Sequence, residues 1–87
     1  MQGLLRVSRA DIGGTPVLRV FTAVLEAEGA YVETLAVERT TAPHTGVAHT
    51  VLVEALAKME RRGWRRVPLT TPVVCAKHEV VLAVQSD

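Results

Sequence analysis

The chain is poor in cysteine, aromatic residues and asparagine, and each shortage limits what the protein can be. Its 87 residues include one cysteine, Cys75, which excludes an intramolecular disulfide and a cysteine-based zinc site. Aromatic residues make up 3% of the chain, so the core must be aliphatic. The lack of asparagine is typical of thermophilic proteins, and a bias in base composition explains it equally well.

The chain also lacks a large excess of either charge and any long apolar run. The formal net charge is +1, which gives no general attraction to a polyanion. No run approaches the roughly 20 apolar residues that cross a bilayer, and the N-terminus lacks the basic and apolar order of a signal peptide. We therefore expect a cytoplasmic protein with one domain over residues 1–87.

The segment from residue 15 to residue 37 carries the most consistent local signals. Thr15 and Pro16 suit the start of a helix, and Gly29 suits its C-terminal cap. The spacing predicts a helix over 16–28, and the β-branched residues after it predict a strand over 30–39. The apolar stripe of this helix consists of Val17, Val20, Phe21, Val24 and Leu25.

Residues 47–59 fit both a helix and a strand, because a run this apolar satisfies both periods. Valine and threonine favour a strand over 47–53, whereas the residues of 54–63 have high helix propensity. We therefore predict a strand followed by a helix that ends at Gly63.

The remaining segments complete a predicted sheet. Residues 4–9 alternate as a strand and 40–46 read as a loop. Residues 64–71 contain Pro68 and read as an edge strand or an irregular approach to the last strand. The apolar run 80–84 is typical of a strand covered on both faces. The predicted fold is an α+β, ferredoxin-like βαββαβ sandwich. A sheet this small leaves edges and apolar faces exposed, so we expect the chain to pair with itself.

The best candidate site from the residues alone is the turn before the first predicted helix. Gly13 and Gly14 offer free backbone N–H groups beside the positive end of that helix, which suits a carboxylate. Neither a phosphate-binding loop nor a dinucleotide fingerprint is present. A plain turn is the simpler interpretation.

Metal and catalytic motifs are weak. The potential metal ligands lack the spacing of a zinc motif, and no histidine is placed to activate the cysteine, so we predict no metal and no cofactor. These ligands are His44, His49, His78 and Cys75. The carboxylates form no recognisable acid and base pair, and nothing in the sequence argues for an enzyme. They include Asp11, Glu33, Glu38 and Glu54.

A basic cluster surrounds Trp64 and suggests a nucleic-acid-binding sandwich as one alternative. Such sheets usually stack bases on several aromatic side chains, and this chain has few. Cations at a solvated helix end that complement the helix dipole are the simpler interpretation. The cluster comprises Lys58, Arg61, Arg62, Arg65 and Arg66.

Residues 4–63 resemble the ACT domain, a small amino-acid-binding regulatory module, and are similar to the regulatory small subunit of acetolactate synthase. The matching positions are Asp11, Val17, Leu18, Phe21, Val24, Leu25, Gly29, Val32, Leu35 and Val37. The resemblance implies a non-catalytic regulatory or dimerisation module, with an amino acid bound at the interface of a homodimer. The implied ligand-binding residues are Asp11, Ile12, Gly13, Gly14, Thr15, Tyr31 and Glu33.

The C-terminal part supports a second alternative. RGWRRVPL and VVLAVQSD are similar to segments of the trimeric bacterial chorismate mutases. This resemblance implies a trimer with a βαβαββ order, which requires residues 47–62 to form one helix. The alternative that this resemblance implies is a chorismate-mutase-like enzyme or a catalytically dead relic of one. Glu79 stands where those enzymes have a catalytic arginine, which favours the scaffold without the chemistry.

Overall fold

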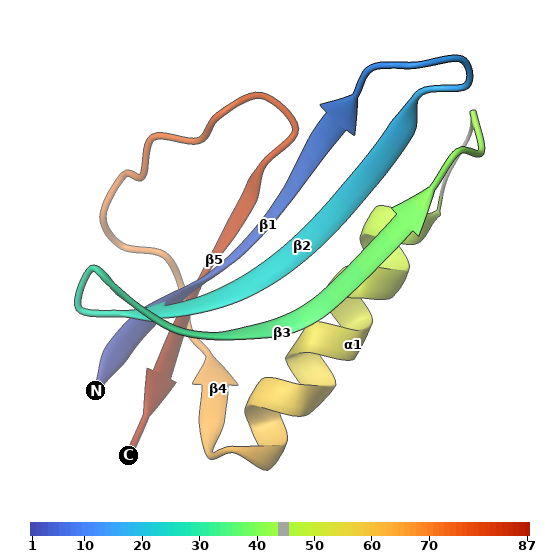
Figure 1. The fold of residues 1–87 in the computed structure, drawn as a ribbon. Helices are drawn as coiled ribbons and strands as arrows, with labels where there is room; N and C mark the ends of the chain where they lie inside the picture. The colour runs from blue at the N-terminus through green and yellow to red at the C-terminus, as the bar shows by residue number, and fades with distance from the viewer. Residues whose placement is uncertain (44–45) are drawn as a thin grey trace.

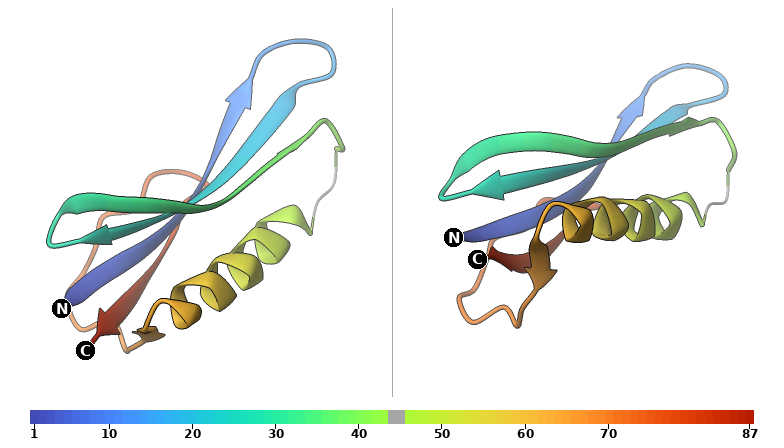
Figure 2. Two further views of the ribbon diagram at one scale, coloured as in Figure 1. Left: turned by 60° about the horizontal axis from the view of Figure 1, so that its bottom comes forward. Right: turned by 90° about the horizontal axis from the view of Figure 1, so that it is seen from below.

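The computed structural model is a half-barrel, in which a strongly curved antiparallel sheet wraps around one helix (Figure 1, Figure 2). The model describes residues 1–43 and 46–87. Their elements are β1 (Gln2–Ile12), β2 (Leu18–Ala27), β3 (Ala30–Thr40), α1 (Val47–Arg61), β4 (Trp64–Arg66) and β5 (Val80–Ser86). The strands lie in the order β3-β2-β1-β5-β4, and every neighbouring pair is antiparallel.

The predicted helix over 16–28 is wrong, because most of this segment is strand β2 (Leu18–Ala27). The apolar stripe was real, but the intervening positions are apolar or β-branched as well, and such a run fits a strand equally well. β2 is held on both sides by long partners, since it pairs with β1 over its full length and with β3 from Arg19 to Ala27. Pairing on both sides decides the conformation that periodicity left ambiguous.

Gly29 ends a strand rather than a helix. Glu28 and Gly29 form the two-residue connection between β2 and β3, and both have positive φ, at 53° and 79°. Two consecutive residues with positive φ are what a tight hairpin turn of the primed type requires. The glycine was correctly read as a stop signal, but the element that it stops was misassigned.

The predicted strand over 47–53 is also wrong, because α1 runs from Val47 to Arg61. Val51, Ala55 and Met59 are fully buried, and their spacing of four residues places them on one side of the helix. Val53, between two of them in sequence, is 51% exposed on the other side. Packing of this single stripe into the hollow of the sheet makes the whole segment helical.

The two-helix, ferredoxin-like βαββαβ fold is therefore contradicted, since α1 is the one helix of the described residues. The βαβαββ order of the mutase-type alternative fails for the same reason. Other local predictions are confirmed: strands were expected over 4–9, 30–39 and 80–84, and these lie within β1, β3 and β5. Of the segment 64–71, only Trp64–Arg66 is an edge strand (β4), which pairs only with β5, and 67–71 are irregular.

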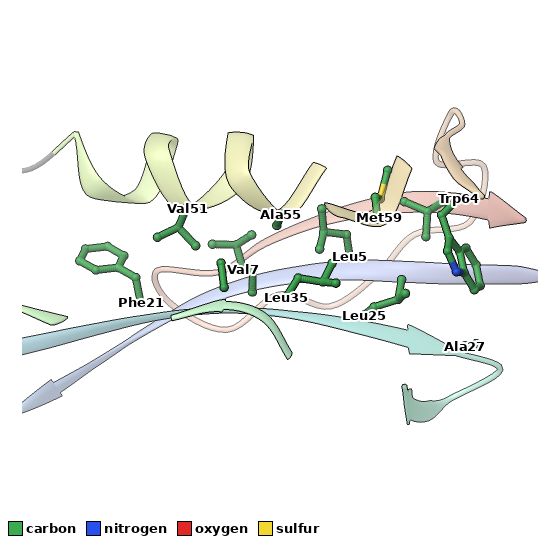
Figure 3. Packing of buried hydrophobic residues seen from close by; sticks show 13 residues of the cluster. Leu5, Val7, Phe21, Leu25, Ala27, Leu35, Val51, Ala55, Met59 and Trp64 are labelled. Carbon is green, nitrogen blue, oxygen red and sulfur yellow. The ribbon is translucent and has the colours of Figure 1, made fainter. Parts of the chain in front are cut away.

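The core lies between α1 and the concave face of the sheet (Figure 3). It is entirely apolar among the described residues and is mostly aliphatic, as the composition required. Its buried members are Leu5, Val7, Phe21, Ala23, Leu25, Ala27, Leu35, Ala36, Val51, Ala55, Met59, Trp64 and Val84.

The other side of the sheet, here called the open face, carries no helix (Figure 2). Side chains alternate between the two faces of a strand, so the neighbours of the buried Leu5, Phe21 and Leu25 point to the open face. A segment without helix or strand, residues 67–79, connects β4 to β5 and is here called the strap. No helix of the described residues is long and apolar enough to cross a membrane.

Candidate functional site at the open face of the sheet

Strand β2 is apolar on both of its faces, which sets it apart from an ordinary half-exposed strand. Phe21, Ala23 and Leu25 are buried against the helix side. The residues that alternate with them on the open face include Leu18, Val20 and Val24, each only partly buried. Antiparallel sheets with one solvated face normally show polar residues on that face. The pattern of β2 is typical of a strand that is covered on both faces.

The apolar surface continues onto the neighbouring strands. Val37 of β3 pairs with Thr22 of β2 and is 39% exposed. Leu4 of β1 faces Ala83 of β5 in the register, and both point away from the helix. Ile12, at the far end of β1, is 52% exposed. Together these side chains make the open face mainly apolar from β3 to β5.

One ionic cluster interrupts this apolar surface. Arg6 Nε lies 2.6 Å from Glu26 Oε1, and Arg6 Nη1 lies 2.6 Å from Glu79 Oε1. The hydrogen bond to Glu26 is the main cause that raises the pKa of the Arg6 guanidinium, and the Glu79 carboxylate acts in the same direction. The side chains of Arg6, Glu26 and Glu79 are 28%, 23% and 11% exposed. The cluster is therefore partly desolvated, and one cation with two anions gives it a formal charge of −1.

Glu79 also ties the strap to the sheet. Its carboxylate accepts a hydrogen bond of 3.3 Å from the backbone N–H of Ala76, in addition to its ion pair with Arg6. The C-terminal end of the strap is thus fixed to the open face by a side chain that immediately precedes β5. Figure 1 shows the strap beside β5, away from α1.

A cleft of about 350 Å³ lies under the N-terminal half of the strap. Its floor includes Leu4 and Ala83, and Val67, Leu69 and Val73 of the strap form its other wall. The turn between β2 and β3 contributes Glu28 and Gly29 at one end. Its volume falls at the lower end of the range of small-molecule sites, and its lining is mainly apolar, as such sites usually are.

The residues predicted to bind an amino acid are not brought together. Asp11 to Thr15 belong to the end of β1 and the connection to β2, whereas Tyr31 and Glu33 lie near the start of β3, at the opposite end of the sheet (Figure 1). The helix assumed after Gly14 is a strand, so no helix dipole strengthens this turn as an anion site.

Several of these side chains are engaged with other partners. The Asp11 carboxylate accepts a hydrogen bond of 3.0 Å from Arg9 Nη2, and Glu33 pairs with Arg62 of the helix end at 2.6 Å. The Tyr31 hydroxyl accepts a 3.0 Å hydrogen bond from the Thr34 backbone. These contacts leave no shared ligand pocket for the predicted set within the described residues.

The candidate metal ligands are scattered as well. Residues 1–43 and 46–87 contain no group of three or more histidine, cysteine or acidic side chains that could hold a metal ion, and His44 lies outside these residues. His78 has its Nε2 2.9 Å from Arg9 Nη2, a contact in which the guanidinium can only donate. Cys75 is exposed in the strap, and His49 lies on α1.

Three of the five cations in the basic cluster near Trp64 form ion pairs, and Arg61 and Arg66 form none among the described residues. Lys58 contacts Glu54 at 3.2 Å and donates to the carbonyl oxygen of Leu35 at 2.8 Å. Arg65 lies 3.6 Å from Asp87, and Arg62 is held by Glu33. Trp64 itself is 9% exposed and belongs to the core, so its ring is not available for a base to stack on.

Sequence reasoning missed the open face and its ionic cluster. Two signals were present: most positions of β2 are apolar on both faces, and Arg6 and Glu26 each stand between apolar neighbours. Their meaning depends on the register, which places Leu4 opposite Glu26 and Arg6 opposite Val24. Comparison with family models, curated proteins and solved structures gives no match to this chain. The resemblances noted from the sequence therefore stay predictions.

Proposed function

We propose that the chain is a non-catalytic assembly module that forms a homodimer by stacking the open faces of two sheets. The observation that carries this proposal is the apolar character of β2 on both sides. Leu18, Val20 and Val24 need a cover that α1 does not provide, and a second copy offers an equally apolar surface. Face-to-face packing of two sheets is a common way to bury such surfaces.

The size of the open face is sufficient for a specific interface. β1, β2 and β3 are 10 or 11 residues long. With about 3.4 Å per residue and about 4.8 Å between strands, they present roughly 500 Å² in projection. Two copies then cover at most roughly 1,000 Å², because the strap lies over part of β1, and this is about the smallest area of a specific interface.

Charge also favours a two-fold arrangement. Arg39 points to the open face and is level with Val20, and no carboxylate of the described residues is paired with it. Arg6 is level with Val24, which lies two residues beyond Thr22 along β2, on the side away from Val20. A two-fold axis across the strands near Thr22 brings Arg39 of each copy to the level of the partner's negatively charged ionic cluster. Opposite charges at matching levels favour this orientation.

The assembly role keeps one part of the function expected from the sequence. The amino-acid ligand expected beside Asp11 to Thr15 is not part of the proposal, because its binding residues lie at opposite ends of the sheet. Nucleic acid binding is not favoured either, since Trp64 is buried and three of the five cations in its basic cluster form ion pairs.

Sedimentation velocity with a matched pair of variants tests the proposal. Val37→Lys places a charge on the open face, and Val53→Lys places the same charge on the outer side of α1; the two valines are 39% and 51% exposed. We expect the wild type and Val53→Lys to be dimers at about 100 µM, a concentration well above a micromolar Kd. Val37→Lys should be a folded monomer.

Three outcomes would count against the proposal. A wild-type monomer at that concentration removes the dimer, and a trimer excludes the two-fold stacking. Equal behaviour of the two lysine variants shows that pairing uses another surface. Circular dichroism of each variant establishes that a change in mass is not a loss of fold.

A further inference from the structure

We propose that the cleft under the strap binds a small molecule with an apolar body and a single protonated amine. This site lies at the β1 and β5 end of the open face, and the inference does not depend on the proposed dimer. It rests on the shape of the cleft, on its lining and on the one charge that it contains.

The walls of the cleft define the apolar body of the ligand. Leu4 and Ala83 form a flat floor on adjacent strands, and the strap supplies Val67, Leu69 and Val73 above it. Leu69 is 48% exposed without a ligand, so a bound molecule would cover apolar surface that is now in water. A volume of about 350 Å³ fits a compact body such as one aromatic ring with a short side arm.

The charge of the cleft defines the polar end of the ligand. Glu28 is the one charged residue among those that line it, and no cation of the described residues forms an ion pair with this carboxylate. The hydroxyl-bearing Thr70 and Thr71 add neutral polar groups to the lining. A protonated amine complements this arrangement, because it meets a carboxylate at the end of an otherwise apolar cleft.

The lining of the cleft also disfavours carboxylates and zwitterionic amino acids as ligands. No arginine, lysine or histidine belongs to its lining, so a bound carboxylate would have no cation to meet. The nearby ionic cluster adds a formal charge of −1, which repels an anion and attracts a cation. Lys77 lies in the strap but does not line the cleft.

A set of probes with the same phenyl ring tests the proposal on the full chain. The probes are 2-phenylethylamine, 2-phenylethanol and phenylalanine, titrated into ¹⁵N-labelled protein and followed by amide chemical shifts. We expect the amine to shift the amides of Gly29 and of residues 67–73 with a Kd of about 1 mM, which suits so small a ligand. The alcohol should bind about fivefold more weakly, since an ion pair at a partly exposed site is worth about this factor. Phenylalanine should bind more weakly still.

Two variants and one control variant show whether the probes bind in the cleft and whether Glu28 recognises the amine. Glu28→Gln should remove the preference for the amine over the alcohol, while the alcohol binds as before. Ala83→Leu should fill the floor of the cleft and weaken every probe by at least about tenfold, because the added side chain occupies the space for the ring. Glu60→Gln, which removes an exposed carboxylate of α1 outside the cleft, should change nothing.

The proposal is overturned if no probe shifts these amides at about 10 mM, if the alcohol or phenylalanine binds as tightly as the amine, or if Glu28→Gln keeps the preference for the amine. These results are separate from those for the dimer. The mass measured by sedimentation for wild type and Val37→Lys is read without any ligand, so either proposal can fail while the other holds.

Discussion

The two faces of the same sheet differ mainly in what covers them, although the open face also carries polar side chains, among them Arg6, Thr22 and Glu26. The concave face holds α1 and a closed core that includes Leu5 and Leu25, both with no exposed surface. The open face carries Leu18, Val20 and Val24 of the same strands, yet they remain partly exposed. The single apolar stripe of α1 covers the concave face. The other face keeps an unsatisfied apolar surface, which is the physical basis of the proposed assembly.

The two faces differ most clearly at Leu25 and Val24, two consecutive residues of β2. Substitution of Leu25 should have the largest effect on stability. Leu25→Ala removes a fully buried side chain from the core and should lower the free energy of unfolding by about 3 kcal/mol. Val24→Ala, on the open face, should lower the stability of the monomer by less than about 1 kcal/mol, because its surroundings are partly solvated. Urea denaturation of both variants at a protein concentration that favours the monomer measures the difference. Equal losses would show that the open face is already covered within one chain.

An intermediate effect is expected at Gly3, where the helix side of β1 is too crowded for a side chain. A Cβ at this position would collide with the backbone oxygen of Glu26 and lie 3.0 Å from the Trp64 ring. Gly3→Ala should therefore cost about 2 kcal/mol through displacement of the strand or the ring. Thermal unfolding with tryptophan fluorescence reports both the stability and the environment of Trp64. Gly13→Ala is the control, because no atom lies within 4 Å of a Cβ at that position, and it should be nearly neutral.

The smallest effect is expected at the ionic cluster of the open face. Glu79→Gln removes one of the two carboxylates bound to Arg6 and should cost about 1 kcal/mol, because the site is only partly desolvated. Hydrogen exchange at Ala76 should become faster, since the neutral amide is a weaker acceptor for its N–H. Glu38→Gln, at an exposed carboxylate of β3, should leave stability and exchange unchanged.

The pH dependence of this cluster follows from the raised pKa of Arg6. A cation with a higher pKa in the folded than in the unfolded state contributes stability below the unfolded value, and this is lost as the pH rises through the folded value. The guanidinium contribution should therefore be constant over the neutral and mildly alkaline range. An Arg6-dependent stability change between pH 7 and pH 9 in urea titrations would contradict this assignment.

The sequence was informative where a local rule acts alone. The strands within β1, β3 and β5 follow from alternation and β-branched composition, and β4 lies at the sheet edge and ends before Pro68, which cannot donate to a ladder. Gly29 and Gly63 were correctly taken as boundaries, and both have positive φ. The ligand set that includes Asp11 and Glu33 rests on a resemblance and stays a prediction; within one chain each of these two carboxylates pairs with an arginine.

The sequence by itself determined an aliphatic core, a chain without a disulfide, and the positions of most turns. It also contained the excess of apolar residues on β2 that motivates pairing. The tertiary structure decided which apolar runs became strand and which became helix, because 16–28 and 47–59 satisfy both periods and only their neighbours select one. It also decided that Arg6, Glu26 and Glu79, distant in sequence, meet on one face, and that Glu28 lies at the end of a cleft. Register and curvature of the sheet create these sites, and neither is a local property of the chain.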